Sequence, residues 1–182
     1  MAASSFDSTH AVRFNLPEGQ VHAGTEAERV LLVPTGAIDD IALSAPPEAV
    51  EALGRAIGAS IGRRAAARMG DAQGASVEAF VTQLAGEAAV SGVGVLSVER
   101  WGRALVVVVE GSPLPSSILS PLVAAAVETA SGRGVACTVL SRDAHMARLL
   151  VGGTSGVERV REWIAGGVAW ADALSRLHGG RS

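Results

Sequence analysis

The stretch from residue 47 to residue 69, PEAVEALGRAIGASIGRRAAARM, constrains the fold more than any other part of the chain. Its larger apolar residues recur at the three- and four-residue spacing of one helical face, and most of its charged residues fall elsewhere. The pattern predicts an amphipathic helix of about six turns, roughly 35 Å long at 1.5 Å per residue. The apolar residues are Val50, Leu53, Ile57, Ile61 and Met69.

Three glycines, Gly54, Gly58 and Gly62, stand four residues apart inside this helix. Glycine in a helix interior costs roughly 1 kcal/mol against alanine, so the three together cost about 3 kcal/mol. The simplest compensation is a second backbone packed closely against this glycine stripe. We therefore expect the helix to be central and tightly covered. The pattern leaves open whether it faces its own sheet or a second subunit.

Composition excludes several classes of protein. The chain has 182 residues, which suits one domain, and its net charge of −3 without a basic block argues against nucleic acid as a partner. It has no run of eighteen uncharged apolar residues, so no membrane span is expected. The N-terminus lacks the basic and apolar segments of a signal peptide. Together with a single cysteine, Cys137, these features predict a cytoplasmic protein.

The rest of the chain alternates helices and hairpins. A single domain over residues 11–178 is expected, between a flexible tail at 1–10 and a loose tail at 179–182. The second strand of the first hairpin, ALVVVV, does not alternate, which predicts that both faces of its sheet are covered. One face can take the chain's own helices, and the other is left for a second subunit. The expected strands are 11–15, 28–35, 93–98, 104–109, 135–140 and 146–151, and the further helices are 77–90, 117–130, 154–164 and 169–177.

This order of elements carries a family resemblance. The segment LGRAIGASIGRR, the helix after it and the hairpin GVGVLSVERWGRALVVVVEGSPL resemble the vinyl-reductase-like domain, whose α/β fold is shared by the small subunits of the TRAPP tethering complex. The later segment ARLLVGGTSGVERVREWIAGGVAWADAL resembles the C-terminal part of bacterial members. The likeness spans roughly residues 28–175 and consists of apolar and glycine positions.

The resemblance implies a mixed α/β fold with a mostly antiparallel sheet packed by helices. It also implies a homodimer that binds a small hydrophobic ligand or docks a protein partner, in a regulatory or scaffold role. The long helix becomes the expected dimer element, with Gly54, Gly58 and Gly62 at the interface. Metal- and phenol-sensing members carry a cysteine-rich C-terminal motif, and this chain has none, so a metal site is not expected. Residues for reduction chemistry are also missing, and no cofactor is predicted.

Helical spacing places candidate ligand contacts on the inner faces of the long helix and the helix after it. If a pocket exists there, we expect aliphatic walls. The candidates are Ile57, Ile61, Phe80 and Leu84.

A candidate partner contact lies at the tip of the first hairpin. Trp101, beside Arg100 and Arg103, stands where a turn usually exposes its residues, so it is able to anchor a partner protein. The alternative is a tryptophan folded down over its own hairpin.

No catalytic residues are predicted. Asp143 and His145 lie two apart, but the chain has no Gly-x-Ser-x-Gly motif, so turn residues are the better interpretation. The loop 152–156 can offer backbone N–H groups to an anion, but Ser155 and Glu158 match the spacing of a capping box that would use the same groups. We favour the capping box. Cys137 is expected to be a small buried core residue.

Two other functions stay open. A roadblock-like regulator or scaffold for a small GTPase fits residues 76–165 almost as well, but it does not require the long helix. A stable folded dimer lacking residues 1–72 would favour it. A tetrapyrrole-related enzyme or accessory protein is the weakest hypothesis, because no acid, base and nucleophile converge.

Overall fold

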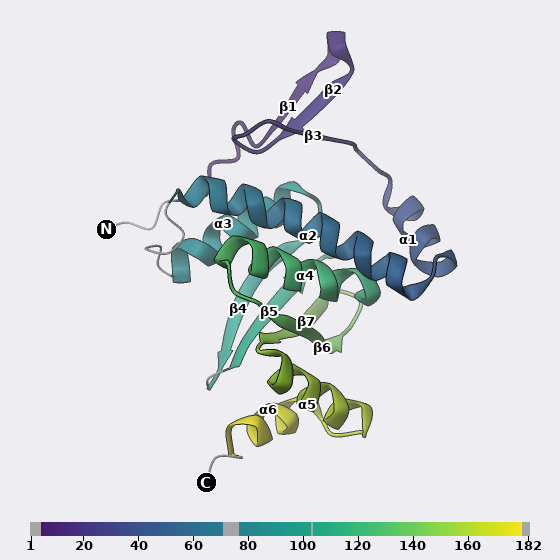
Figure 1. Cartoon of the computed structure of the whole chain (residues 1–182), viewed down its shortest axis with the longest axis vertical. Coiled ribbons are helices and arrows are strands. Elements are labelled where there is room, and N and C mark those ends of the chain that lie inside the picture. Colours follow the sequence, from purple (N-terminus) through teal and green to yellow (C-terminus); the bar gives the residue numbers. More distant parts are fainter. Residues whose placement is uncertain (1–4, 71–76, 103, 180–182) are drawn as a thin grey trace.

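The computed structural model describes residues 5–70, 77–102 and 104–179. It has a mixed α/β fold in which antiparallel sheets are packed by helices, as the sequence predicted. Helices lie on both sides of a four-stranded sheet, and a smaller three-stranded sheet stands apart from this body (Figure 1). None of the helices in the described part of the chain combines the length and apolarity that crossing a bilayer requires.

Two β-hairpins form the four-stranded sheet. Their strands are β4 (Val95–Trp101) with β5 (Ala104–Glu110), and β6 (Ala136–Arg142) with β7 (Met146–Gly152). The hairpins meet through β5 and β7, so the order is β4-β5-β7-β6, and every neighbouring pair is antiparallel. Strands β4 and β6 are therefore the edges of the sheet.

Helices of the same chain cover both faces of this sheet. One layer holds α2 (Pro47–Met69), α3 (Val77–Val90) and α4 (Ser116–Ser131), and the opposite layer holds α5 (Thr154–Ala165) and α6 (Trp170–Gly179) (Figure 1). The helices predicted at these places are all present, with bounds shifted by a few residues at most.

The valine run of β5 is explained by these two layers. Val107 and Val109 belong to the hydrophobic core beneath α2, α3 and α4, and Val106 and Val108 belong to the core formed with α5 and α6. Because side chains alternate along a strand, a strand buried on both faces reads as a continuous apolar run. The expectation that a second subunit covers one face is wrong, since α5 and α6 occupy it.

The glycine stripe of α2 packs on the backbone of α4. A Cβ added at Gly54 would lie 2.6 Å from the carbonyl oxygen of Ile118, and one added at Gly62 would lie 2.5 Å from that of Ala126. At Gly58 it would collide with the carbonyl of Leu122. The second backbone that offsets the cost of these glycines therefore belongs to the same chain. The three glycines are buried, so α4 takes the place that a dimer partner was expected to fill.

The N-terminal arm, residues 12–44, differs most from the prediction. It contains β1 (Val12–Asn15), β2 (Gln20–Ala23) and β3 (Glu28–Val30), antiparallel in that order, followed by α1 (Thr35–Ser44). A short 3-10 helix, Leu16–Glu18, joins β1 to β2. The strand predicted over 28–35 ends at Val30, and α1 replaces part of the expected connector. In Figure 1 the small sheet projects away from the body.

The segment before the arm is docked through Phe6 and through the Asp7 carbonyl oxygen, which accepts a hydrogen bond from Arg68 Nη1 at 3.2 Å. The ring of Phe6 lies against Gly86 of α3, where no Cβ would fit, and the Arg68 guanidinium stands 4.5 Å from the ring centroid. This part of the expected N-terminal tail therefore contacts the body.

Candidate functional site

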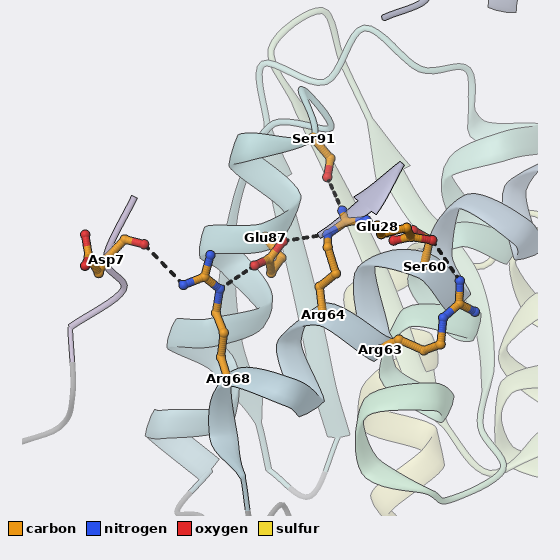
Figure 2. Close-up of polar contacts among 8 residues, drawn as sticks. All are labelled: Asp7, Glu28, Ser60, Arg63, Arg64, Arg68, Glu87 and Ser91. Atoms are coloured by element: carbon orange, nitrogen blue, oxygen red, sulfur yellow. Dashed lines mark hydrogen bonds and ion pairs between the residues drawn. The ribbon is translucent and has the colours of Figure 1, made fainter. Parts of the chain in front are cut away.

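The most buried charges of the described residues form an ion cluster between α2 and α3 (Figure 2). Glu87 of α3 is fully buried, and its two carboxylate oxygens accept hydrogen bonds from Arg64 Nε at 2.8 Å and Arg68 Nε at 2.5 Å. Both arginines come from α2, four residues apart and so on one face of the helix. A buried carboxylate needs such partners, because desolvation of an unpaired charge is very costly.

Arg64 links Glu87 to the N-terminal arm. Its Nη1 donates to Glu28 Oε2 of β3 at 2.9 Å and to Ser60 Oγ at 2.7 Å, and its Nη2 donates to Ser91 Oγ at 2.7 Å. Glu28 also accepts from Ser60 Oγ at 2.7 Å and from Arg63 at 3.1 Å. Figure 2 shows these side chains converging from α2, α3 and β3. The cluster thus fastens three separate elements together.

Glu28 remains ionised at neutral pH in this setting. Partial burial on its own would raise the pKa of its carboxyl group, but hydrogen bonds from Ser60, Arg64 and Arg63 outweigh it and hold the pKa below its ordinary value. A cavity of about 170 Å³ lies beside Glu28, Arg63 and Arg64. Sites for organic ligands usually measure about 300–1,000 Å³. The ion cluster is therefore structural, with its charges satisfied inside the chain.

A larger opening lies at the free edge of β6, and we call it the β6 groove. It has a volume of about 370 Å³ and is walled by α2, α4, α5 and the first residues of β6. Its polar lining consists of Glu51, Arg55, Ser117, Ser120 and Arg161. Pro121, Ala124 and Val135 contribute apolar surface. Its volume lies within the range of small-molecule sites, and its lining is more polar than is usual for them.

Side chains from opposite faces of the sheet close the β6 edge in this groove. Ser120 Oγ of α4 donates to the Cys137 carbonyl oxygen at 3.2 Å, and Arg161 Nη2 of α5 donates to the same oxygen at 3.1 Å. Arg161 Nε also lies 3.4 Å from Thr138 Oγ1. The Cys137 side chain is buried as predicted, and burial raises the pKa of its thiol to about 12, so the thiol is not a nucleophile at neutral pH.

The four residues predicted to wall a pocket lie together in the core. Ile61 and Leu84 are buried within the cluster beneath α2, α3 and α4, and Ile57 and Phe80 pack against it. Neither of the two cavities described above is lined by them.

Trp101 contacts both α6 and its own hairpin. Its ring meets Trp170 edge to face, with 4.9 Å between centroids, and its Nε1 donates to Glu99 Oε2 at 3.0 Å. It stays 39% exposed, and Arg100 is exposed beside it. Arg103 lies outside the described residues. A partner contact at this tip stays a prediction.

Two turns were also singled out in the sequence. Asp143 Oδ1 accepts from the backbone N–H groups of His145 and Met146 at 2.8 and 2.9 Å, which is a turn as expected. The capping box is wrong: α5 begins two residues earlier than that motif requires, with Gly153 as N-cap and no side-chain cap. Across the part of the chain that the structure describes, no three His, Cys, Asp or Glu side chains come together as metal ligands.

The sequence held a usable signal for the ion cluster. Arg64 and Arg68 continue the spacing of Ile57 and Ile61, so they fall on the core face, and arginine there requires a buried acidic partner. The β6 groove gave no such signal, because its arginines lie 106 positions apart on two different helices.

Comparison with known proteins finds a structural neighbour. A scan against protein-family models and a search of curated proteins found no match. Among solved structures, the chain is similar to the phenol-responsive sensory domain of the transcription activator PoxR, determined with phenol. The two are 15% identical with a TM-score of 0.63, and the match covers 88% of this chain and 98% of that domain. At this level of identity the likeness shows a shared α/β fold.

Proposed function

We propose that this chain is a non-enzymatic module that binds a small organic molecule in a regulatory role. The observation that carries the proposal is its likeness to nearly the whole of a sensory domain whose structure was determined with phenol. The resemblance to the vinyl-reductase-like domain, which we keep as a proposal, points to the same kind of function.

We place the ligand in the β6 groove. The groove is open and of suitable size. The aliphatic residues predicted as pocket walls are already packed against one another, so Ile57, Ile61, Phe80 and Leu84 would have to separate before a ligand could enter between them.

Native mass spectrometry of the purified protein, beside its denatured mass, tests this proposal. A non-covalent adduct of small mass that disappears on denaturation would support it. If the protein carries no adduct and binds no member of a library of small organic compounds, the proposal fails. A scaffold that docks proteins would then be the better interpretation. Alanine at Ile57 and at Ile61 serves as the control, since ligand uptake lost in these variants but kept in groove variants would move the site to the core.

We further propose that the module is a homodimer that works in the cytoplasm and associates through the N-terminal arm. Seven of the ten large apolar residues that are exposed in the described chain belong to this arm: Phe14, Leu16, Leu31, Leu32, Val33, Ile41 and Leu43. Their exposed fractions run from 41% for Ile41 to 87% for Leu43. Burial of such side chains against a second copy is favourable, because it removes apolar surface from water.

The same mass spectra test the dimer. We expect the wild-type chain to be dimeric and the double variant Leu31→Asp, Leu32→Asp to be monomeric, because each copy would bury charges in the interface. Val95→Asp is the control, since Val95 is also exposed but lies on β4, away from the arm. A monomeric wild-type chain, or a double variant that still dimerises, would contradict this part of the proposal.

A further inference from the structure

We infer that the β6 groove selects organic monoanions, and specifically molecules with one carboxylate group on a short apolar body. This inference rests on the proposed function and narrows it to a ligand class and an anchoring residue. Phenol, the ligand of the structural neighbour, is neutral at physiological pH, so the two ligand classes can be separated by experiment.

Arg161 is the charge in the groove that favours a negative ligand. Arg55 and Glu51 also line the groove, but Arg55 is already paired with Glu128. Arg161 has no ion pair with any of the residues that the structure describes, so one carboxylate can match it. Guanidinium groups are also the side chains best suited to carboxylates, because their planar N–H donors match the two oxygens.

Arg161 is the anchor because the chain already holds it in place. Its Nη2 donates to the Cys137 carbonyl oxygen at 3.1 Å and its Nε approaches Thr138 Oγ1 at 3.4 Å. A guanidinium has five N–H groups, so these two contacts orient the exposed Arg161 side chain and leave further donors for a ligand. An oriented donor loses less conformational entropy on binding, which favours affinity.

Arg55 has a second role at the opposite wall. Its Nη2 pairs with Glu128 at 3.1 Å, in a contact that is about half exposed on the arginine side. Such an exposed pair contributes little to stability, so Arg55 can reorient toward a ligand at small cost.

The remaining walls accept the apolar part of the ligand. Pro121, Ala124 and Val135 lie in the same lining as the two arginines, and Ser117 and Ser120 also line it. A groove of about 370 Å³ has room for a one-ring carboxylate. Benzoate, which is anionic at neutral pH, is therefore a suitable probe.

Isothermal titration calorimetry of the full chain with benzoate tests the inference, with benzyl alcohol as the neutral compound of similar size. We expect benzoate to bind more tightly than benzyl alcohol. Arg161→Gln should weaken benzoate binding about tenfold or more, because it removes charge-assisted hydrogen bonds. The matched control is Arg159→Gln. Arg159 lies on the same helix and its guanidinium stands over the Trp163 ring, so this variant should bind benzoate like the wild type.

A second variant, expected to bind benzoate more tightly, separates a loss of binding from a loss of folding. Arg161 also closes the β6 edge, so Arg161→Gln could lower affinity by disturbing the fold. Glu51→Gln removes the like charge from the lining and should tighten benzoate binding by about twofold to threefold, which a damaged protein would not do.

The outcomes separate the two proposals. If benzyl alcohol binds as tightly as benzoate, or if Arg161→Gln binds benzoate like the wild type, the carboxylate inference is overturned and the proposed small-molecule function stands. If neither compound binds, the carboxylate inference fails, and the library screen described above decides the proposed function. Tight benzoate binding that weakens in Arg161→Gln and strengthens in Glu51→Gln supports both.

Discussion

Among the three glycines of α2, Gly58 is the one where an added Cβ would come nearest to the backbone of α4, and it gives a direct test of the packing. We predict that Gly58→Ala lowers the free energy of unfolding by about 2 kcal/mol, because its methyl group meets the Leu122 backbone, which cannot rotate away. This loss outweighs the gain of roughly 1 kcal/mol that alanine brings to a helix interior. Urea denaturation measures the difference.

Gly36 provides the matched control for Gly58. It also lies in a helix, α1, but a Cβ added there meets nothing within 4 Å. Gly36→Ala should therefore be neutral or stabilising by up to about 1 kcal/mol. Equal stability of Gly58→Ala and the wild type would show that α4 can shift away from α2.

Glu87 gives the test of the ion cluster. Glu87→Gln leaves Arg64 and Arg68 facing an uncharged amide in a buried site, and we predict a loss of about 3 kcal/mol in the free energy of unfolding. The control is Glu128→Gln, which breaks the exposed pair with Arg55 and should cost about 1 kcal/mol or less. Similar losses in the two variants would mean that the cluster contributes no more than a surface ion pair.

Strand β3 is fastened to α2 through one carboxylate, which makes its contribution dependent on pH. The folded-state pKa of Glu28 lies below the ordinary value of 4.5. The stabilisation from Glu28 is therefore fully present above pH 4.5 and is lost as the pH falls through the lower folded-state pKa. We predict that wild type is more stable than Glu28→Gln at pH 7 and that the difference shrinks below pH 4.5. Urea midpoints of both proteins from neutral pH to pH 3 measure it. A difference that stays constant with pH would contradict the role assigned to this carboxylate.

Most of the helices and strands that the sequence could predict bury a face, although β1 was also predicted and has no buried residue. Helix α2 carries both an apolar face and a glycine stripe, and β5 carries a valine run, so the sequence pattern itself predicts that they are buried. Helix α1 has no buried residue, and its core-facing side consists of the partly buried Ile38 and Ala42, which is too short an apolar pattern to predict a helix. Strand β2 lies in a segment rich in glycine and proline, which hid it.

The candidate sites divide in the same way. The glycine stripe predicted a close backbone correctly, but spacing alone could not identify α4 as the helix that supplies it. The predicted pocket walls, such as Ile61 and Leu84, were correctly placed on inner faces, and periodicity cannot distinguish a filled core from a cavity. The β6 groove depends on which helices flank an edge strand, which is a property of the folded chain.

The whole fold depends on α2, and this separates the alternatives for function. We predict that a chain lacking residues 1–72 does not fold, because α2 contributes Val50, Ile61 and Ala65 to the core and covers α4 along its length. Far-UV circular dichroism and a thermal melt of the truncated chain measure this. A cooperative melt from a dimeric truncated protein would instead favour the roadblock-like regulator, which does not need this helix.

The two edges of the main sheet are not equivalent. At β6 the Cys137 carbonyl oxygen is already an acceptor for Ser120 and Arg161, so an incoming strand would have to displace donors from both helical layers. At β4 the exposed Val95 lies at the beginning of the strand. Sheets that can be extended on one side alone pair once and then stop, because each added copy presents its closed side outward. Edge-to-edge pairing of the four-stranded sheet would therefore end at two chains and would not grow into fibres.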